Sequence, residues 1–197
     1  TFEENYRNEL ESNLLMHNEE TLERFYTNYY KKVVKEIKDI KLPEGLTEKE
    51  KKVYYSTYFC SLMNYKEDKE SNYKAFMAGH NYIKPMRSYY RDSYYTVLPL
   101  YSSHPEMIRN QIITLANGVT ESGECPSAVK FDYTPWWLGH YDSPSFLVIM
   151  LYDYVNYTKD YSVLYELVNN KTVLEISSLA IHKLAEREKN GFIYKSG

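Results

Sequence analysis

Glycine and proline are scarce in this sequence. Each occurs only seven times among 197 residues, and they gather between stretches with helical periodicity. We find no alternation of apolar and polar residues bounded by hairpin turns, which is the pattern that predicts strands. The sequence therefore predicts an all-α protein. A chain of this length can bury a real core, so residues 1–197 are expected to form a single domain.

Other features that the sequence lacks exclude whole classes of function. The two cysteines, Cys60 and Cys125, lie far apart and have neither a disulfide-framework pattern nor metal-ligand spacing. No apolar stretch approaches the roughly 20 residues of a membrane span. The net charge is −3, and lysines and arginines never form a block longer than a pair. We expect no metal, no organic cofactor, no nucleic-acid or membrane partner, and a cytoplasmic location.

Tyrosine, in contrast, is abundant, with 23 copies. It combines apolar area with a hydroxyl that needs a partner, so it suits ligand clefts and half-exposed surfaces as well as cores. A biased genome composition would explain the same count. The tyrosines therefore allow a binding site without proving one.

Apolar residues at three-to-four-residue spacing predict three pairs of helices, beginning with a long amphipathic helix over residues 22–40. Three capping boxes mark further helix starts: Thr47 with Glu50, Ser103 with Glu106, and Thr172 with Glu175. Asp160 is expected to start a short helix. Gly118 and Gly191 are expected to end helices of the second and third pair.

A repeat suggests how these helices are arranged. Asp92-Ser93 and Asp142-Ser143 stand 50 residues apart, and each opens an apolar helix that a more amphipathic one follows. Helix pairs at this period indicate stacked hairpins with parallel inner helices. The long loops, 64–90 and 119–141, would then lie together over the N-termini of the inner helices. An irregular helical domain is the alternative interpretation.

Charged and aromatic residues are concentrated around these two loops. Aromatic rings stack on sugar rings, while arginine and carboxylates bind hydroxyls, so the combination predicts a carbohydrate site. The candidate substrate-binding residues are Tyr82, Arg91, Asp92, Trp136, Trp137, His140 and Asp142, with His80 nearby. The candidate catalytic carboxylates are Asp142 and Glu124. Purely structural readings stay open: helix caps for the aspartates, a hydrophobic plug for the tryptophans, structural histidines and a solvated Glu124.

Three segments carry a resemblance to a known group of enzymes. YRDSYYTVLPLY (residues 90–101) resembles the R-D-S/T motif of toroidal (α/α)6 glycoside hydrolases. HYDSPSFLVIMLYDYVNYTKDYSVL (140–164) is similar to their D-x-P-x-F…Y-x-Y…T-G-D segment, with Lys159 where that pattern usually has glycine. KNGFIY (189–194) is similar to their G-L-I-Y element. The nearest group is the amylo-α-1,6-glucosidase domain of glycogen-debranching enzymes, with its glucoamylase-, trehalase- and rhamnosidase-like relatives.

The resemblance implies a toroid of six helical hairpins, of which this chain supplies about three. It implies a glycosidase acting on α-glucosidic or related linkages, inverting like most of the group. The acid and base would lie outside residues 1–197, leaving Arg91, Asp92 and the Asp142 loop to bind sugar. The rest of the toroid, or another chain, would cover the open flank. Two alternatives remain: a non-catalytic helical-repeat interaction domain, and a toroid lyase or epimerase with a Tyr or His base.

Overall fold

A computed structural model describes residues 44–79 and 86–194, together with positions 27, 31, 35, 40 and 42. The helix expected over 22–40 therefore falls mostly outside the described residues. The chain divides into two compact units, 1–55 and 56–197, with the boundary inside helix α3, Glu48–Met63. The capping box before α3 is confirmed: Glu50 Oε2 accepts from the Thr47 amide at 2.7 Å, and Thr47 Oγ1 accepts from the Glu50 amide at 3.3 Å.

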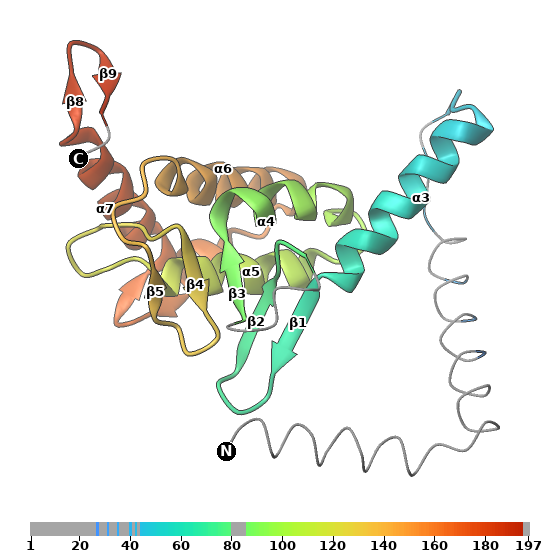
Figure 1. Cartoon of the computed structure of the whole chain (residues 1–197), viewed down its shortest axis with the longest axis horizontal. Helices are drawn as coiled ribbons and strands as arrows, with labels where there is room; N and C mark the ends of the chain where they lie inside the picture. Colours follow the sequence, from blue (N-terminus) through green and yellow to red (C-terminus); the bar gives the residue numbers. More distant parts are fainter. Residues whose placement is uncertain are drawn as a thin grey trace. The chain divides into compact units, whose positions relative to one another are not determined.

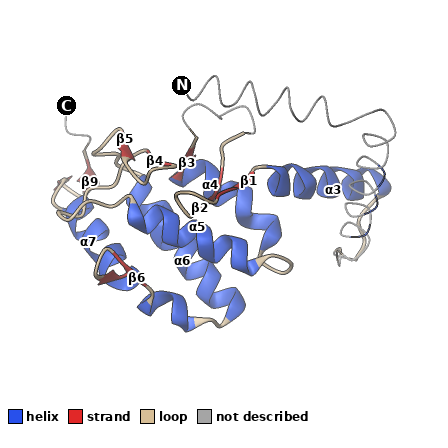
Figure 2. Ribbon diagram, turned by 90° about the horizontal axis from the view of Figure 1, so that it is seen from below, coloured by secondary structure: helices blue, strands red, loops and turns tan. Residues whose placement is uncertain are grey.

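The prediction of an all-α fold is wrong. In the part that the structure describes, five α-helices are accompanied by nine short strands in four small sheets (Figure 2). The second unit runs β1 Tyr65–Asp68, β2 Tyr73–Phe76, β3 Arg87–Tyr89, α4 Tyr90–Val97, η1 Leu98–Leu100, α5 Pro105–Asn117, β4 Ala128–Lys130, β5 Pro135–Trp136, α6 Ser143–Thr158, η2 Tyr161–Tyr165, β6 Leu167–Val168, β7 Lys171–Thr172, α7 Val173–Ala185, β8 Glu188–Lys189 and β9 Phe192–Ile193 (Figure 1). This mixed fold is not the all-helical toroid that the motifs implied.

Asparagine residues form the tight turns of two β-hairpins, β6–β7 and β8–β9, which the all-α prediction did not include. Asn169 and Asn170 join β6 to β7 with φ of 50° and 64°, while Asn190 and Gly191 join β8 to β9 with φ of 56° and 79°. Positive φ at both central residues is what a type I′ hairpin turn requires. Strands of two residues are too short to show alternation. Gly191 therefore belongs to a hairpin, and does not end a helix as predicted.

The two long loops are tied together by a three-stranded antiparallel sheet. β3 pairs with β4, placing Ser88 opposite Val129, and β5 pairs with the other edge of β4. Ser88 and Val129 are fully buried. Because β3 runs directly into α4, this sheet fixes both loops at the start of that helix.

Helices α4 and α6 lie side by side and run parallel (Figure 1). At their beginnings, Arg91 of α4 donates to Asp142, the residue before α6. Beyond the end of α4, the Tyr101 ring packs on that of Tyr157 in the last turn of α6, with centroids 5.8 Å apart. Contacts thus advance along both helices in the same direction, which confirms the predicted orientation of the inner helices.

Helices α5 and α7 run the opposite way. The Tyr90 hydroxyl, in the first turn of α4, donates at 2.6 Å to the Leu115 carbonyl near the end of α5. Arg187, which follows α7, donates at 2.8 Å to the Gly139 carbonyl, which precedes α6. Each inner helix is therefore followed by an antiparallel outer helix, as in the predicted hairpins.

In the second unit, two of the expected helix caps are confirmed and one is wrong. Thr172 and Glu175 form a complete capping box on α7, and Asp160 accepts from the Ser162 amide at the start of η2. The N-cap of α5 is instead His104, and no side chain caps this helix. Ser103 is used elsewhere: its hydroxyl oxygen lies 2.9 Å from the hydroxyl of Tyr58, which donates to it.

The core around α5 contains polar groups whose hydrogen bonds are satisfied. Gln111 is fully buried; its Oε1 accepts from the Phe76 amide at 2.6 Å, and its Nε2 donates to the Ser88 hydroxyl at 2.9 Å. The buried Tyr73 hydroxyl donates to the Val129 carbonyl at 2.9 Å. Buried polar groups cost stability unless they are paired in this way. Several tyrosines are thus core residues that cross-link the small sheets and helices.

Candidate functional site

The beginnings of α4 and α6 meet through Arg91 and Asp142. Arg91 Nε donates to Asp142 Oδ2 at 2.7 Å, and Nη2 of the same guanidinium also contacts that oxygen. The hydrogen bond and the charge of Asp142 raise the pKa of Arg91 above its usual value. Half of the Arg91 side chain, 51%, remains exposed, compared with 19% of Asp142. Two residues predicted to share a site are therefore in contact.

Asp142 occupies the N-cap position of α6 without capping it. Its side chain accepts no helix amide. An N-cap oxygen normally accepts from the second or third helical amide, and the second residue of α6 is Pro144, which has none. Asp142 Oδ1 is buried and accepts no hydrogen bond from the described residues, although His140 Nδ1 lies 2.7 Å from it, at ion-pair distance. Asp142 therefore stands at the expected N-cap position, but its side chain does not cap the helix.

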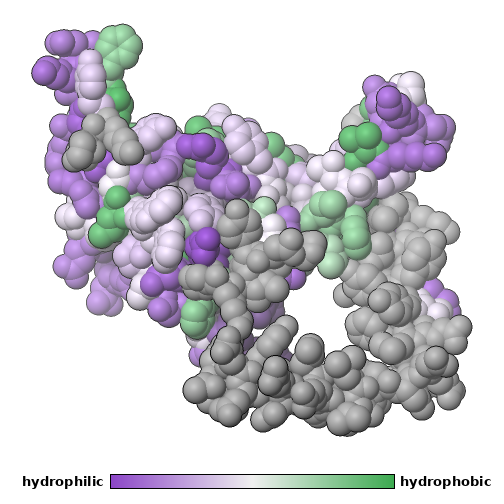
Figure 3. All heavy atoms as spheres, in the orientation of Figure 1, coloured by the Kyte–Doolittle hydropathy of each residue, from purple (hydrophilic) through white to green (hydrophobic). Residues whose placement is uncertain are grey.

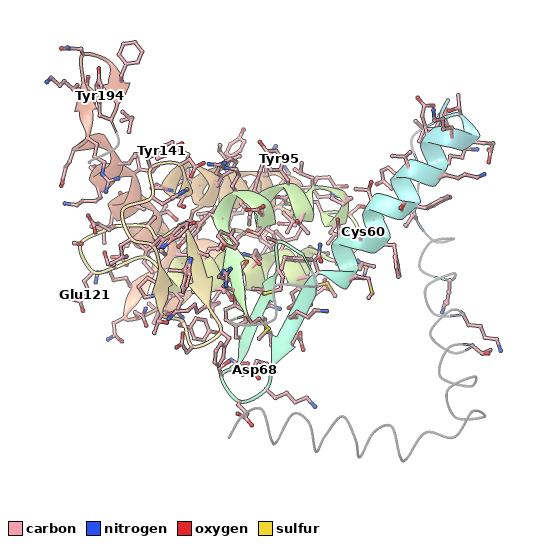
Figure 4. All side chains as sticks on the ribbon, in the orientation of Figure 1. Cys60, Asp68, Tyr95, Glu121, Tyr141 and Tyr194 are labelled. Carbon is pink, nitrogen blue, oxygen red and sulfur yellow. The ribbon has the colours of Figure 1, made fainter. Side chains whose placement is uncertain are left out.

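His140 and Tyr141 complete this group of side chains. The His140 amide donates to the Cys125 carbonyl at 3.0 Å, and its Nδ1 lies 3.0 Å from the Ser143 hydroxyl. Its ring stacks on that of Tyr141, with centroids 5.5 Å apart and planes at 24°. Tyr141 is exposed (Figure 4) and lies close enough to Arg91 to add to the rise in its pKa, after the larger effect of Asp142. We call these four residues the Arg91 cluster: Arg91, His140, Tyr141 and Asp142.

Asp92 is adjacent to Arg91 in the chain, and its side chain makes no hydrogen bond to the Arg91 cluster. It is exposed in the first turn of α4, whose N-cap is Tyr89. Among the described residues, its carboxylate has no hydrogen-bond partner, while its carbonyl accepts from the Thr96 hydroxyl at 2.8 Å. A negative charge in a first helical turn favours the helix through its dipole. Asp92 therefore supplies a solvated carboxylate next to Arg91.

The two tryptophans form a separate aromatic group. Trp136 on β5 stacks on Trp137 with ring centroids 6.1 Å apart, and the Arg87 guanidinium lies 4.9 Å from the Trp136 ring. Trp137 is 71% exposed and adopts φ 51°, so it does not plug the loop. Arg87 was missed from the sequence. Its alternation with Tyr89 on one strand, which puts both on one face, is the signal that could have found it.

Glu124 is held by a second residue that the sequence did not point to, Arg187, at 3.7 Å. Because Arg187 also donates to Gly139, it ties the Glu124 loop to the segment that leads into the Arg91 cluster. Burial raises the pKa of the neighbouring Cys125 thiol to about 12, so this cysteine is protonated and unreactive near neutral pH. The predicted residues Tyr82 and His80 lie outside the described residues.

Comparison with known protein families, curated proteins and solved structures finds no match to this chain. The resemblance to toroidal glycosidases therefore remains a prediction from sequence motifs. Within 44–79 and 86–194, no three His, Cys, Asp or Glu side chains gather as metal ligands. Over the same described residues, no helix combines the length and apolar character that crossing a bilayer requires.

Proposed function

We propose that the chain binds carbohydrate at the Arg91 cluster and is the sugar-binding part of a glycoside hydrolase. The observation that carries this proposal is a half-exposed arginine–carboxylate pair flanked by an exposed tyrosine ring. Sugars present hydroxyls at the edge of the ring and C–H groups on its faces. The cluster offers a matching partner for each: charged donors and acceptors for the hydroxyls, and the Tyr141 ring for a face.

The hydrogen-bonding capacity that remains at the cluster supports the proposal. A guanidinium has five N–H donors, and the contacts to Asp142 engage only Nε and Nη2 of Arg91. Asp142 Oδ1 is buried beside His140 Nδ1, which lies 2.7 Å away. The exposed carboxylate of Asp92, one residue from Arg91, is therefore the acceptor that a ligand can reach. Hydrogen bonds to charged groups contribute about 1.5–3 kcal/mol each, compared with about 1 kcal/mol for neutral pairs. A ligand rich in hydroxyls would use these groups.

Cleavage of the glycosidic bond requires more than the cluster offers. Hydrolysis uses two carboxyl groups on either side of the bond, one to protonate the leaving group and one to activate water or attack. Asp142 is engaged by Arg91, and Glu124 by Arg187. We therefore assign sugar binding to the chain and place the acid and base outside residues 1–197.

Binding of α-linked gluco-oligosaccharides, measured by calorimetry or by amide chemical shifts, tests the proposal. Asp142→Asn preserves side-chain size while removing a charge, and Arg91→Gln removes the guanidinium and its charge but keeps a polar side chain; each should weaken binding at least tenfold, or about 1.4 kcal/mol. Glu106→Gln is the matched control, since Glu106 is an exposed acid in the first turn of α5. Wild-type affinity in both cluster variants, or no binding by the wild type across a panel of sugars, would contradict the proposal.

An exposed apolar face favours a second candidate function, binding to another protein chain. Tyr95 of α4 and Leu98, the first residue of η1, are exposed three residues apart, and on α6 Ile149 and Tyr152 are exposed at the same spacing. Such a face marks an interaction surface when it is continuous. Hydrophobic side chains also gather on the β8–β9 hairpin, at the upper left of Figure 3. Sedimentation of wild type and Tyr152→Lys distinguishes the candidates: loss of self-association or partner binding with unchanged sugar binding would support this one.

A further inference from the structure

A cavity of about 310 Å3 lies between the loop after α5, the β6–β7 hairpin and the first half of α7. It shares no residue with the Arg91 cluster. The hairpin is held against the end of α5 by a hydrogen bond of 3.0 Å from Asn169 Nδ2 to Asn117 Oδ1. The volume falls at the small end of the range of about 300–1,000 Å3 that is usual for ligand pockets.

Aliphatic side chains line part of this cavity. They come from Val119, Val168, Ile176 and Leu179, of which Val168 and Ile176 are buried. No aromatic ring is among the lining residues, so a sugar would find no stacking partner here. An aliphatic group of a ligand would be removed from water on this surface, which favours binding.

The remaining lining is polar and carries one charge of each sign. Glu121 comes from the loop after α5 and Lys171 from β7 (Figure 4 labels Glu121). Within the described residues, neither side chain has an ion-pair or hydrogen-bond partner. Lys171 does lie near Glu175, but that carboxylate is held by Thr172 in the capping box. The Asn170 amide, also without a partner in the described part, adds one donor and one acceptor.

These groups restrict the chemistry of the ligand. A simple anion would be attracted by Lys171 and repelled by Glu121, and a simple cation would meet the reverse. A zwitterion satisfies both charges, and an aliphatic side chain would cover the apolar lining. We infer that this cavity binds a free aliphatic amino acid, with its carboxylate at Lys171, its ammonium at Glu121 and its side chain on the valine, isoleucine and leucine residues.

Titration of the whole chain with L-leucine, followed by calorimetry or amide chemical shifts, tests the inference. Saturable binding is expected, with shifts centred on the loop after α5 and the β6–β7 hairpin. Leucine amide lacks the carboxylate, N-acetyl-leucine lacks the ammonium and glycine lacks the side chain, so each should bind at least tenfold more weakly. Equal binding of all four compounds, or no saturation by leucine at about 10 mM, roughly ten times a Kd of 1 mM, would overturn it.

Variants then assign the two charges. Glu121→Gln should weaken the binding of leucine and of leucine amide at least tenfold, because both carry the ammonium, and should leave N-acetyl-leucine unaffected. Lys171→Gln should do the reverse, weakening leucine and N-acetyl-leucine while leaving leucine amide unaffected. Lys69→Gln and Glu70→Gln are matched controls, because both are exposed charges in the β1–β2 loop. Melting temperatures of all variants show whether they fold. Folded Glu121 and Lys171 variants that bind leucine like the wild type would refute the inference. Arg91→Gln should leave leucine binding unchanged, which separates this site from the sugar site.

Discussion

Replacing Gly118 with alanine should destabilise the chain, although local backbone conformation alone predicts the opposite. Gly118 is the C-cap residue of α5, with φ −79° and ψ −12°, which alanine adopts without strain. Restricting the unfolded chain would then stabilise the protein by about 0.4–1 kcal/mol. However, an added Cβ would lie 2.2 Å from Val129 Cγ2 and 3.1 Å from the Tyr90 hydroxyl. Glycine is thus required here by the close approach of β4, and not by a left-handed backbone.

The size of the effect follows from how little this site can adjust. Val129 is fully buried on the central strand of its sheet, and Tyr90 is fully buried with its hydroxyl bonded to Leu115. Overpacking a core costs about 1–3 kcal/mol. An overlap this large puts Gly118→Ala toward the upper end, so we expect a net loss of about 2 kcal/mol after the entropic gain. For a protein of this size that lowers the melting temperature by about 4–8 °C.

Thermal or urea unfolding, followed by circular dichroism, measures this loss, and a double-mutant cycle identifies its cause. Val129→Ala removes the methyl group that the new Cβ would meet, so the double variant should be at least about 1 kcal/mol more stable than the sum of the single changes. Additive effects, or a Gly118→Ala variant that melts above the wild type, would show that β4 does not pack on the end of α5.

Three further changes have expected outcomes. Lys159→Gly should stabilise the protein by about 0.5–1 kcal/mol in urea unfolding, because Lys159 ends α6 with φ 60°, where glycine is unstrained; a loss would contradict this. Gln111→Leu should cost about 1–3 kcal/mol, since it leaves the buried Phe76 amide unpaired; a neutral effect would disprove that pairing. The Ser162 and Tyr154 hydrogen bonds hold the pKa of Asp160 below its ordinary 3.8. Ionised Asp160 therefore stabilises the folded protein fully above its unfolded pKa of 3.8. This stabilisation is lost as the pH falls through the lower pKa of Asp160 in the folded state. Unfolding from about pH 6 to pH 3 should accordingly show a smaller acid loss in Asp160→Asn than in the wild type, and equal losses would exclude a role for Asp160.

Features set by a few neighbouring residues could be predicted from the sequence. Thr47 with Glu50, and Thr172 with Glu175, satisfy each other's amides within four residues, so the capping boxes do not depend on tertiary structure. The Ser103 prediction was wrong because a distant residue, Tyr58, binds that hydroxyl. The 50-residue repeat implied parallel inner helices and so predicted that Arg91 and Asp142 lie near each other, but their hydrogen bond was not predicted.

Local sequence patterns could not predict the short hairpins β6–β7 and β8–β9 or the contacts of Arg187. A strand of two residues has no period, so only the turn pairs at 169–170 and 190–191 indicate β6 to β9, and Asn-Gly is the stronger signal of the two. Arg187 follows α7, and its contacts with Glu124 and Gly139 depend on how α7 packs against the preceding loops. Sequence spacing contains no information on such contacts.

The local sequence at Asp142 explains why this carboxylate is free to meet Arg91. The N-cap residues of α4 and α7 are extended, Tyr89 with ψ 141° and Thr172 with ψ 153°. Asp142 instead has φ −100° and ψ −16°, outside the extended region typical of a side-chain cap. Pro144 removes the second helical amide, one of the two donors that would hold the aspartate against its own helix. The order Asp-Ser-Pro thereby leaves a carboxylate at a helix N-terminus, where the dipole favours negative charge, without using it as a cap. Because α4 packs parallel to α6, it places the Arg91 guanidinium beside this carboxylate. The charged pair therefore depends on the positions of both helices.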